Sequence, residues 1–114
     1  MKLINKSKNN LVLFEHLEDA RSSFKSGLGL MGRKSMQASE CLFLSGYWIH
    51  TFFMRFAIDV IYVNKAFTVL KIDRNLRPWR ISLPVFKARH VFECNAHMTE
   101  KLDIQLGDQL YVGH

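Results

Sequence analysis

The sequence predicts a single small domain of the mainly β class, a β-rich α+β fold in which a compact antiparallel or mixed barrel or sandwich carries two short helices. Short runs rich in β-branched and aromatic residues recur along the chain between turn residues. No repeat, low-complexity segment or linker divides the 114 residues, a length typical of one domain. The composition is 48% hydrophobic, which provides enough apolar surface for a packed core. Residues 1–114 are therefore expected to form one domain.

Several segments have the pattern of β-strands. The strongest pair is residues 58–63 and 67–72, joined by Asn64-Lys65-Ala66, because Asn tolerates the left-handed backbone that a tight hairpin turn needs. The second half of residues 11–17 alternates between two faces, and residues 41–44 are short and apolar, as expected for a buried strand. Two later strands are predicted at residues 89–94 and 109–112, the second entered through a Gly107-Asp108 turn.

Two segments have helical spacing instead. Leu17, Ala20, Phe24 and Leu28 recur at intervals of three and four, which predicts a helix over residues 19–26 that ends at Gly27. A second, shorter helix is predicted over residues 96–102.

Asn95 is in position to cap this second helix, and Met98 and Leu102 would face the sheet. Pro78 and Pro84 favour a long loop over residues 74–86, since proline is excluded from the interior of a sheet.

The charge and the cysteines limit the classes of partner. The net charge of +6 allows an acidic partner such as nucleic acid, and the concentrated basic stretch runs from Arg74 to Arg89 without an acid between Asp73 and Glu93. Cys41 and Cys94 lack Cys-x-x-Cys spacing, which predicts buried free thiols and no metal or cofactor. The spacing does not set whether the two thiols approach one another.

The N-terminal residues predict a soluble, cytoplasmic protein. After the charged start, the only apolar run before Glu15 is residues 11–14, which is too short for the core of a signal peptide. An apolar stretch approaching the roughly 18 residues of a membrane span is also absent from the sequence. A membrane partner is therefore not expected.

A polar set within ten residues is the first candidate site. His50, Thr51, Arg55 and Asp59 bring together an imidazole, a hydroxyl, a guanidinium and a carboxylate. Asp59 interrupts an apolar strand, and a carboxylate drawn toward a core is costly unless it is paired. Two interpretations stay open: Arg33 or Arg55 clamps Asp59 as a structural ion pair, or one of these arginines receives an anionic ligand in a cleft.

The basic stretch is the second candidate. Trp79 and Phe86 lie among its arginines, a pattern found in grooves that bind single-stranded nucleic acid. The structural alternative, which we favour because no nucleic-acid module is recognised, is that Trp79 plugs the edge of the core and that solvent surrounds the arginines.

Four blocks of sequence carry a resemblance to a known family. They are Gly29-Leu30-Met31 followed by Arg33, the run from Ile49 to Val60, Pro78-Trp79-Arg80-Ile81-Ser82, and Val91-Phe92-Glu93 with Gly107-Asp108 downstream. In this order they resemble the uncharacterised family known as domain of unknown function 192 (DUF192). The resemblance implies a compact, mostly β barrel or sandwich with short helices, and it implies no established activity.

The leading functional prediction is a ligand-binding module with a polar cleft for a small anionic or hydroxyl-rich ligand. Its predicted lining is Arg33, His50, Thr51, Arg55, Asp59, Trp79 and Ser82. One alternative is a small enzyme that acts on a polar metabolite through His50 and Asp59. The other is a nucleic-acid or protein adaptor that uses the basic loop over residues 74–89. The ligand and the oligomeric state are left open by the sequence.

Overall fold

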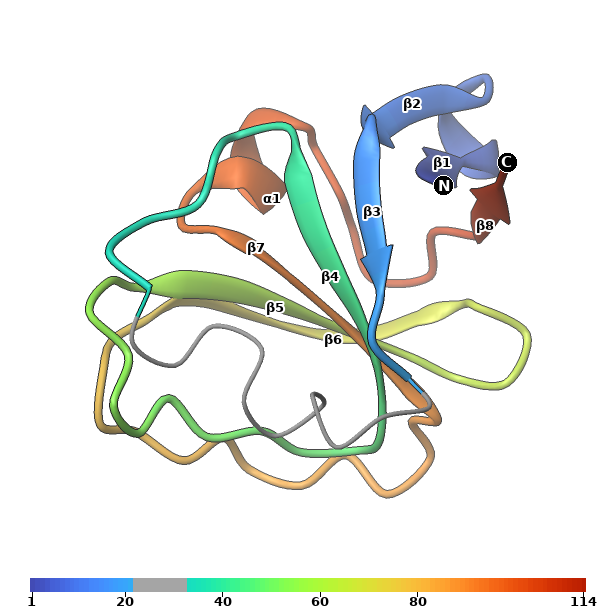
Figure 1. Cartoon of the computed structure of the whole chain (residues 1–114). Coiled ribbons are helices and arrows are strands. Elements are labelled where there is room, and N and C mark those ends of the chain that lie inside the picture. Colours follow the sequence, from blue (N-terminus) through green and yellow to red (C-terminus); the bar gives the residue numbers. More distant parts are fainter. Residues whose placement is uncertain (22–32) are drawn as a thin grey trace.

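The computed structural model describes residues 1–21 and 33–114, and within them the chain is mostly β (Figure 1). The elements are β1 (Lys2–Asn5), the 3-10 helix η1 (Lys6–Lys8), β2 (Leu11–Phe14), β3 (His16–Asp19), β4 (Glu40–Ser45), β5 (Ile58–Val63), β6 (Val69–Leu76), β7 (His90–Asn95), α1 (Met98–Lys101) and β8 (Leu110–Gly113). A small sheet has the order β2-β1-β8, and a large sheet has the order β3-β4-β7-β5-β6. The large sheet is mixed, because β3 runs parallel to β4 whereas the other neighbours are antiparallel.

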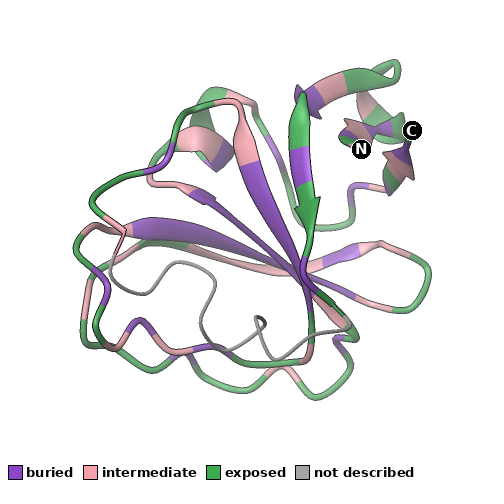
Figure 2. Ribbon diagram, viewed as in Figure 1, coloured by how far each residue is buried: buried purple, intermediate pink, exposed green. Residues whose placement is uncertain are grey.

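The sheets form a sandwich-like arrangement, with hydrophobic clusters on both faces of the large sheet. Successive residues of a strand point to opposite faces, so Phe43 of β4 joins one cluster and Leu42 joins the other. The first cluster contains Leu3 and Leu110 from the small sheet, and the second is covered by loop residues such as Met54. Strands β4, β5 and β7 are therefore mostly buried (Figure 2). This confirms the predicted fold class in its sandwich form.

The predicted hairpin is confirmed, since β5 pairs antiparallel with β6. Asn64 shapes the turn through its side chain, whose Oδ1 accepts hydrogen bonds from the backbone N–H of Ala66 at 2.9 Å and of Thr68 at 3.0 Å. The left-handed residue of the turn is Phe67, with φ 65°, so the backbone role predicted for Asn64 is wrong. The predicted turn before β8 is correct, and Gly107 supplies its left-handed residue with φ 87°.

Other boundaries differ from the predictions. Strand β1 was not predicted, because its apolar residues are few; it lies between β2 and β8, which comes from the far end of the chain. The segment over residues 11–17 forms two strands, β2 and β3, separated at Glu15. Strand β6 continues to Leu76, so the long loop begins at residue 77 and not at residue 74.

The predicted helices are corrected in part. Asp19 is the last residue of β3, and most of the helix predicted over residues 19–26 lies outside the described residues. The second helix, α1, is shorter than the predicted segment over residues 96–102. Asn95 does not cap it: Asn95 ends β7 and donates a side-chain hydrogen bond to the carbonyl oxygen of Met36 at 3.2 Å, while left-handed His97 precedes α1. Met98 and Leu102 pack against the first cluster, as predicted.

The two cysteines lie directly opposite one another in the register of β4 and β7. Cys41 and Cys94 are free and buried, which confirms the prediction. Burial raises the pKa of both thiols well above the ordinary value. Both thiols are therefore protonated, and a protonated thiol is a poor nucleophile. In the part of the chain that the structure describes, the helices are too short to cross a membrane.

Candidate binding surface

Two loops, residues 46–57 and 77–89, run side by side along the lower edge of the molecule in Figure 1 and are joined by backbone hydrogen bonds. Gly46 donates to the carbonyl oxygen of Arg89 at 3.0 Å, and Val85 donates to that of Tyr47 at 2.8 Å. The pairing continues from Ser82 N to Ile49 O at 2.9 Å, from Thr51 N to Arg80 O at 2.8 Å and from Trp79 N to Thr51 O at 2.9 Å. These contacts make one ordered unit of two segments about 30 residues apart in the sequence. We call this unit the two-loop surface.

Two of the predicted ligand-binding residues hold the loops together. The buried hydroxyl of Thr51 donates to the carbonyl oxygen of Arg77 at 2.5 Å and accepts from the backbone N–H of Arg80 at 2.9 Å. The buried hydroxyl of Ser82 accepts from the backbone N–H of Ile49 at 2.9 Å. Both hydroxyls are occupied by the protein, so their role in this structure is support for the surface.

The outer side of the two-loop surface carries a continuous series of aromatic rings. Trp48 lies 6.3 Å from His50, measured between ring centroids, and His50 lies 4.9 Å from Phe52. Trp79, from the other loop, lies 6.0 Å from Phe52 and 4.7 Å from Phe53. Trp79 is 56% exposed and Phe53 is 59% exposed. The interpretation that Trp79 plugs the edge of the core is therefore wrong.

Phe53 and Trp79 also share an unusual backbone conformation. Their φ angles are 63° and 64°, in the left-handed region that bulky residues rarely adopt. Such conformations cost about 1–3 kcal/mol each and cluster at functional sites. Here the strained backbone presents two large rings to solvent. Because the rings are not buried, hydrophobic burial does not offset the conformational cost.

The same two loops are basic and contain neither Asp nor Glu. Their cations are Arg55, Arg77, Arg80, Lys87 and Arg89, all exposed. The salt bridges found among the described residues involve none of these five side chains. Arg80 and Arg89 donate only to backbone carbonyl groups nearby, at 3.1 to 3.5 Å. The surface therefore presents uncompensated positive charge beside exposed rings.

His50 is held in a defined orientation between the loops. It forms an isolated bridge with Ile81, and its Nδ1 accepts a hydrogen bond from the backbone N–H of Phe52 at 3.2 Å. Because Nδ1 accepts, the proton of the neutral imidazole resides on Nε2.

Asp59 has partners other than the predicted ones. Its carboxylate is completely buried, as expected, but Oδ1 accepts from the backbone N–H of Asn75 at 2.9 Å, and Oδ2 accepts from the backbone N–H of Thr99 at 3.0 Å and from its hydroxyl at 2.5 Å. Arg55 is exposed and makes no ion pair with any described residue. The prediction that Arg33 or Arg55 clamps Asp59 is wrong, because three donors of Asn75 and Thr99 already satisfy the carboxylate.

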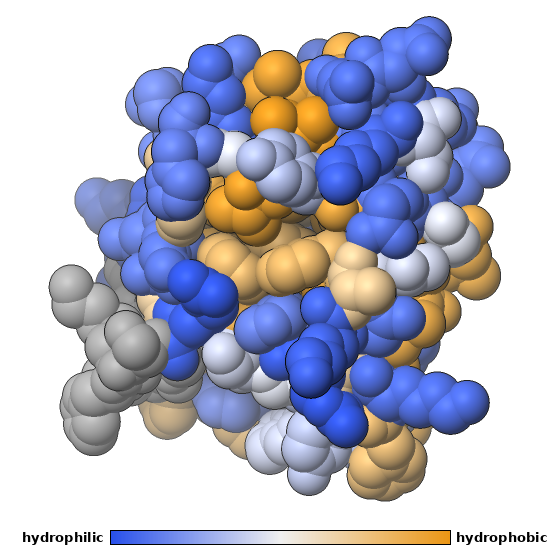
Figure 3. Space-filling view, turned by 90° about the vertical axis from the view of Figure 1, so that its right-hand side faces the viewer, coloured by the Kyte–Doolittle hydropathy of each residue, from blue (hydrophilic) through white to orange (hydrophobic). Residues whose placement is uncertain are grey.

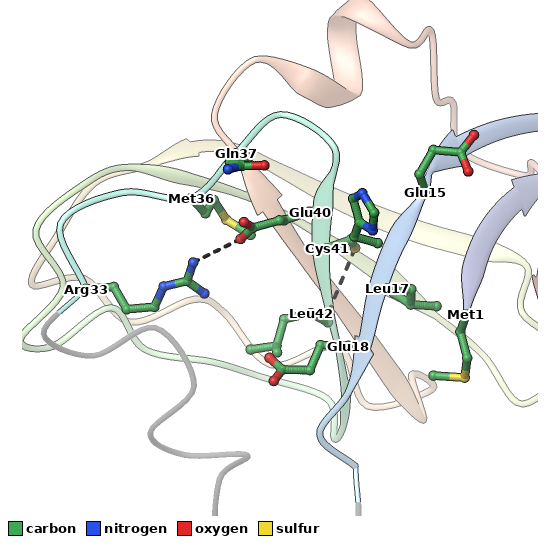
Figure 4. A pocket seen from close by; sticks show the side chains of 11 residues that line it. Met1, Glu15, Leu17, Glu18, Arg33, Met36, Gln37, Glu40, Cys41 and Leu42 are labelled. Atoms are coloured by element: carbon green, nitrogen blue, oxygen red, sulfur yellow. Dashed lines mark hydrogen bonds and ion pairs between the residues drawn. The ribbon is translucent and has the colours of Figure 1, made fainter.

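Arg33 lies beside a pocket of about 530 Å³ at strands β3 and β4. Its guanidinium points toward Glu40, with 2.9 Å between Nη2 and Oε2 (Figure 4). Glu15, Glu18 and Gln37 also line this pocket. The other six predicted residues are absent from the lining of this pocket.

The enzyme alternative required Asp59 to orient His50. The hydrogen bonds of these two side chains go to different partners, so Asp59 does not orient the imidazole. The described residues contain no group of three or more His, Cys, Asp or Glu side chains that could hold a metal ion.

Glu93 of β7 is an unusual acid that the sequence indicated only weakly. It is 6% exposed, and among the described residues its carboxyl group has no hydrogen-bond or ion-pair partner. Its register partners are Leu42 and Val60, which belong to the second hydrophobic cluster. Burial raises the pKa of Glu93 to about 7. The sequence offered one signal for this buried acid, namely a charged residue within an apolar strand.

Comparison with protein families gives a match over nearly the whole chain. The family model DUF192, described as "Uncharacterized ACR", matches residues 3–112. The UPF0127 protein PH1112 of Pyrococcus horikoshii is 33% identical over 112 residues, which is 95% of this chain and 96% of that protein. A UPF0127 protein of Thermococcus sibiricus is 30% identical over 113 residues, covering 95% of this chain and 72% of that protein.

Two solved structures share the fold. A protein of unknown function from Novosphingobium aromaticivorans matches with a TM-score of 0.85 and 22% identity, over 98% of this chain and 84% of that one. A "putative transcription regulator" from Sinorhizobium meliloti matches with a TM-score of 0.79 and 21% identity, over 96% of this chain and 89% of that one. At these identities the likeness concerns the fold alone.

Proposed function

This chain belongs to the uncharacterised family DUF192, and we propose from the two-loop surface that it is a binding module. The module holds an anionic or hydroxyl-rich ligand on that surface. The observation that carries the proposal is the series of exposed rings beside exposed cations that lack acidic partners. A planar ring or sugar of the ligand stacks on Trp79 and Phe53. An anionic group pairs with Arg55, whose guanidinium can bind it in a bidentate manner.

The proposal assigns different roles to the predicted site residues. His50, Arg55 and Trp79 are the proposed ligand contacts. Thr51 and Ser82 support the surface through the hydrogen bonds between the loops. Arg33 and Asp59 take no part, since the first pairs with Glu40 and the second is buried against Thr99.

Binding is favoured over catalysis for a physical reason. A general base needs an orienting acceptor and a nucleophile within hydrogen-bond reach. Asp59, the acid proposed for the first role, has its three hydrogen bonds elsewhere. The strained, exposed rings instead supply contact area at a low entropic cost, because their backbones are already fixed.

A thermal-shift screen tests the proposal. Inorganic phosphate, mononucleotides and sugar phosphates are added separately, and a compound that binds the folded state raises the melting temperature by mass action. The shift should shrink in Trp79→Ala and in Arg55→Ala. Leu106→Ala is the matched control, because Leu106 is an exposed apolar residue outside both loops.

Two results would contradict the proposal. One is the absence of any shift at millimolar concentrations of every compound. The other is a shift of the same size in the wild type and in both variants of the two-loop surface.

A further inference from the structure

The rings of the two-loop surface extend further than one small ligand requires. Beyond the series that ends at Phe53, Tyr47 and Phe86 form a second contact across the loops, with ring centroids 5.7 Å apart. Phe86 is 76% exposed. Seen from the side, apolar side chains protrude at the lower edge of the molecule, the edge along which both loops run (Figure 3). Such an extent suits an elongated partner that carries many rings.

We propose that the ligand of the two-loop surface is a single-stranded nucleic acid. Its bases stack on the exposed rings of Trp48, Phe53 and Trp79, and its phosphates contact cations of the same loops, including Arg55 and Arg77. This inference rests on the proposed function and names the class of ligand.

Stacking explains why the rings are exposed and ordered. Every base has a π-face, so a row of aromatic side chains binds single strands with little dependence on sequence. The backbone N–H of Trp79 donates a hydrogen bond to the carbonyl oxygen of Thr51. The hydroxyl of Thr51 donates another to the carbonyl oxygen of Arg77, two residues before Trp79. The rings are therefore in place before the ligand arrives, which lowers the ordering cost of binding.

Charge supports the same partner. The five cations of the surface are exposed, and neither loop contains an acid to repel phosphates. Each cation that contacts a phosphate releases counterions, which gives affinity at low salt and a steep loss as salt rises. A single strand is favoured over a duplex, because the bases of a duplex are already stacked and cannot reach the rings.

An anionic lipid surface shares the charge chemistry and is the competing occupant. Exposed Ile81 and Leu83 would suit a bilayer. The rings, however, contact one another in a series along hydrogen-bonded backbone, which fixes them as a row of neighbouring rings. This arrangement favours stacking over insertion.

Fluorescence anisotropy with labelled single-stranded DNA and RNA of roughly 12 nucleotides tests the inference, since single-strand binding folds cover about 4–16 nucleotides. Both oligonucleotides should bind more tightly than a mononucleotide and more tightly than a duplex of the same length. If about four cations contact phosphates, the affinity should fall about 50-fold between about 50 and about 200 mM salt.

Variants separate the two kinds of contact. Trp79→Ala should lower the affinity about tenfold or more with little change in the salt dependence, and Trp79→Phe should restore part of the loss. Arg77→Ala should lower the affinity and make the salt dependence less steep. Lys65→Ala is the charge-matched control, because Lys65 is an exposed cation on the β5–β6 hairpin. Circular dichroism confirms that each variant is folded.

The outcomes distinguish this inference from the proposed function. Equal affinity for mononucleotides and oligonucleotides, with Trp79→Ala still weakening both, overturns the nucleic acid and retains a small-ligand surface. If the protein sediments with phosphatidylserine vesicles and does not bind oligonucleotides, the nucleic acid is overturned and the two-loop surface binds membranes. Failure to bind oligonucleotides, vesicles and every compound of the thermal-shift screen overturns both proposals.

Discussion

The hydroxyl of Thr99 donates a hydrogen bond of 2.5 Å to the buried carboxylate of Asp59, 40 residues away in the chain. The same hydroxyl oxygen accepts a hydrogen bond from Nε of Arg74 at 3.2 Å, so a guanidinium reaches the acid only through Thr99. Together with the backbone N–H groups of Asn75 and Thr99, this contact replaces the water that Asp59 loses on folding. The acid in the apolar strand thereby joins β5 to β6 and α1.

Asp59→Asn should destabilise the protein by about 3 kcal/mol. The amide nitrogen of Asn cannot accept the hydrogen bonds that one carboxylate oxygen accepts, and hydrogen bonds to charged groups are worth about 1.5–3 kcal/mol each. Thr99→Val should cost about half as much, because the backbone N–H of residue 99 still donates. Urea unfolding monitored by circular dichroism measures both effects.

Arg55→Ala is the control for this prediction. Arg55 is exposed and unpaired among the described residues, so its removal should change the free energy of unfolding by less than about 0.5 kcal/mol. If Arg55→Ala lowers the free energy of unfolding as much as Asp59→Asn does, the result would instead support the ion pair between Arg55 and Asp59 expected from the sequence.

The contrast between Asp59 and its partners illustrates what the sequence can predict. An acid within the apolar run of β5 was enough to predict burial and a need for partners. The partners were not predictable, because Asn75 and Thr99 reach Asp59 through the packing of β6 and α1. The hairpin between β5 and β6 was predictable since its pattern and turn are local.

The candidate surface was likewise predictable only in part. Pro78 and Pro84 correctly indicated a loop, and Trp79 was recognised as a candidate ring. The pairing of residues 49–51 with residues 79–82 connects segments about 30 residues apart, and a sequence pattern does not encode such a register. The exposure of Phe53 and Trp79 follows from that pairing and from their left-handed backbones. Strand β1 was missed in part for a similar reason, since one of its two partners, β8, lies at the far end of the chain.

Glu93→Gln should remove a dependence of stability on pH. The pKa of Glu93 is about 7 in the folded protein, against an ordinary value of 4.5, so the folded state holds a proton that the unfolded state releases between these values. The wild type should therefore lose about 3 kcal/mol of stability as the pH rises from about 4.5 to about 7. Urea unfolding of the wild type and of Glu93→Gln at several pH values measures the difference.

Glu100→Gln is the matched control, because Glu100 is an exposed acid on α1. Its stability profile should follow that of the wild type. If Glu93→Gln also follows the wild type, the carboxyl group of Glu93 is not held in an apolar site.

Phe53→Gly should be more stable than Phe53→Ala by about 1 kcal/mol. At φ 63° a glycine is relaxed, whereas alanine keeps the steric cost of the left-handed backbone. At Leu83, an exposed loop residue whose φ is not positive, the order should reverse, with glycine less stable than alanine by about 0.5–1 kcal/mol. Thermal unfolding of the four variants gives both differences, and the same order at both positions would remove the argument from strain.

Intrinsic tryptophan fluorescence tests the two-loop surface most directly, because the only two tryptophans of the chain, Trp48 and Trp79, both lie on it and are about half exposed. Titration with a single-stranded oligonucleotide of roughly 12 nucleotides should quench the emission, with the same dissociation constant as the anisotropy measurement. Trp48→Phe should retain a quenched signal from Trp79. Unchanged emission at an oligonucleotide concentration that saturates the anisotropy would place the bound strand elsewhere on the protein and contradict the account.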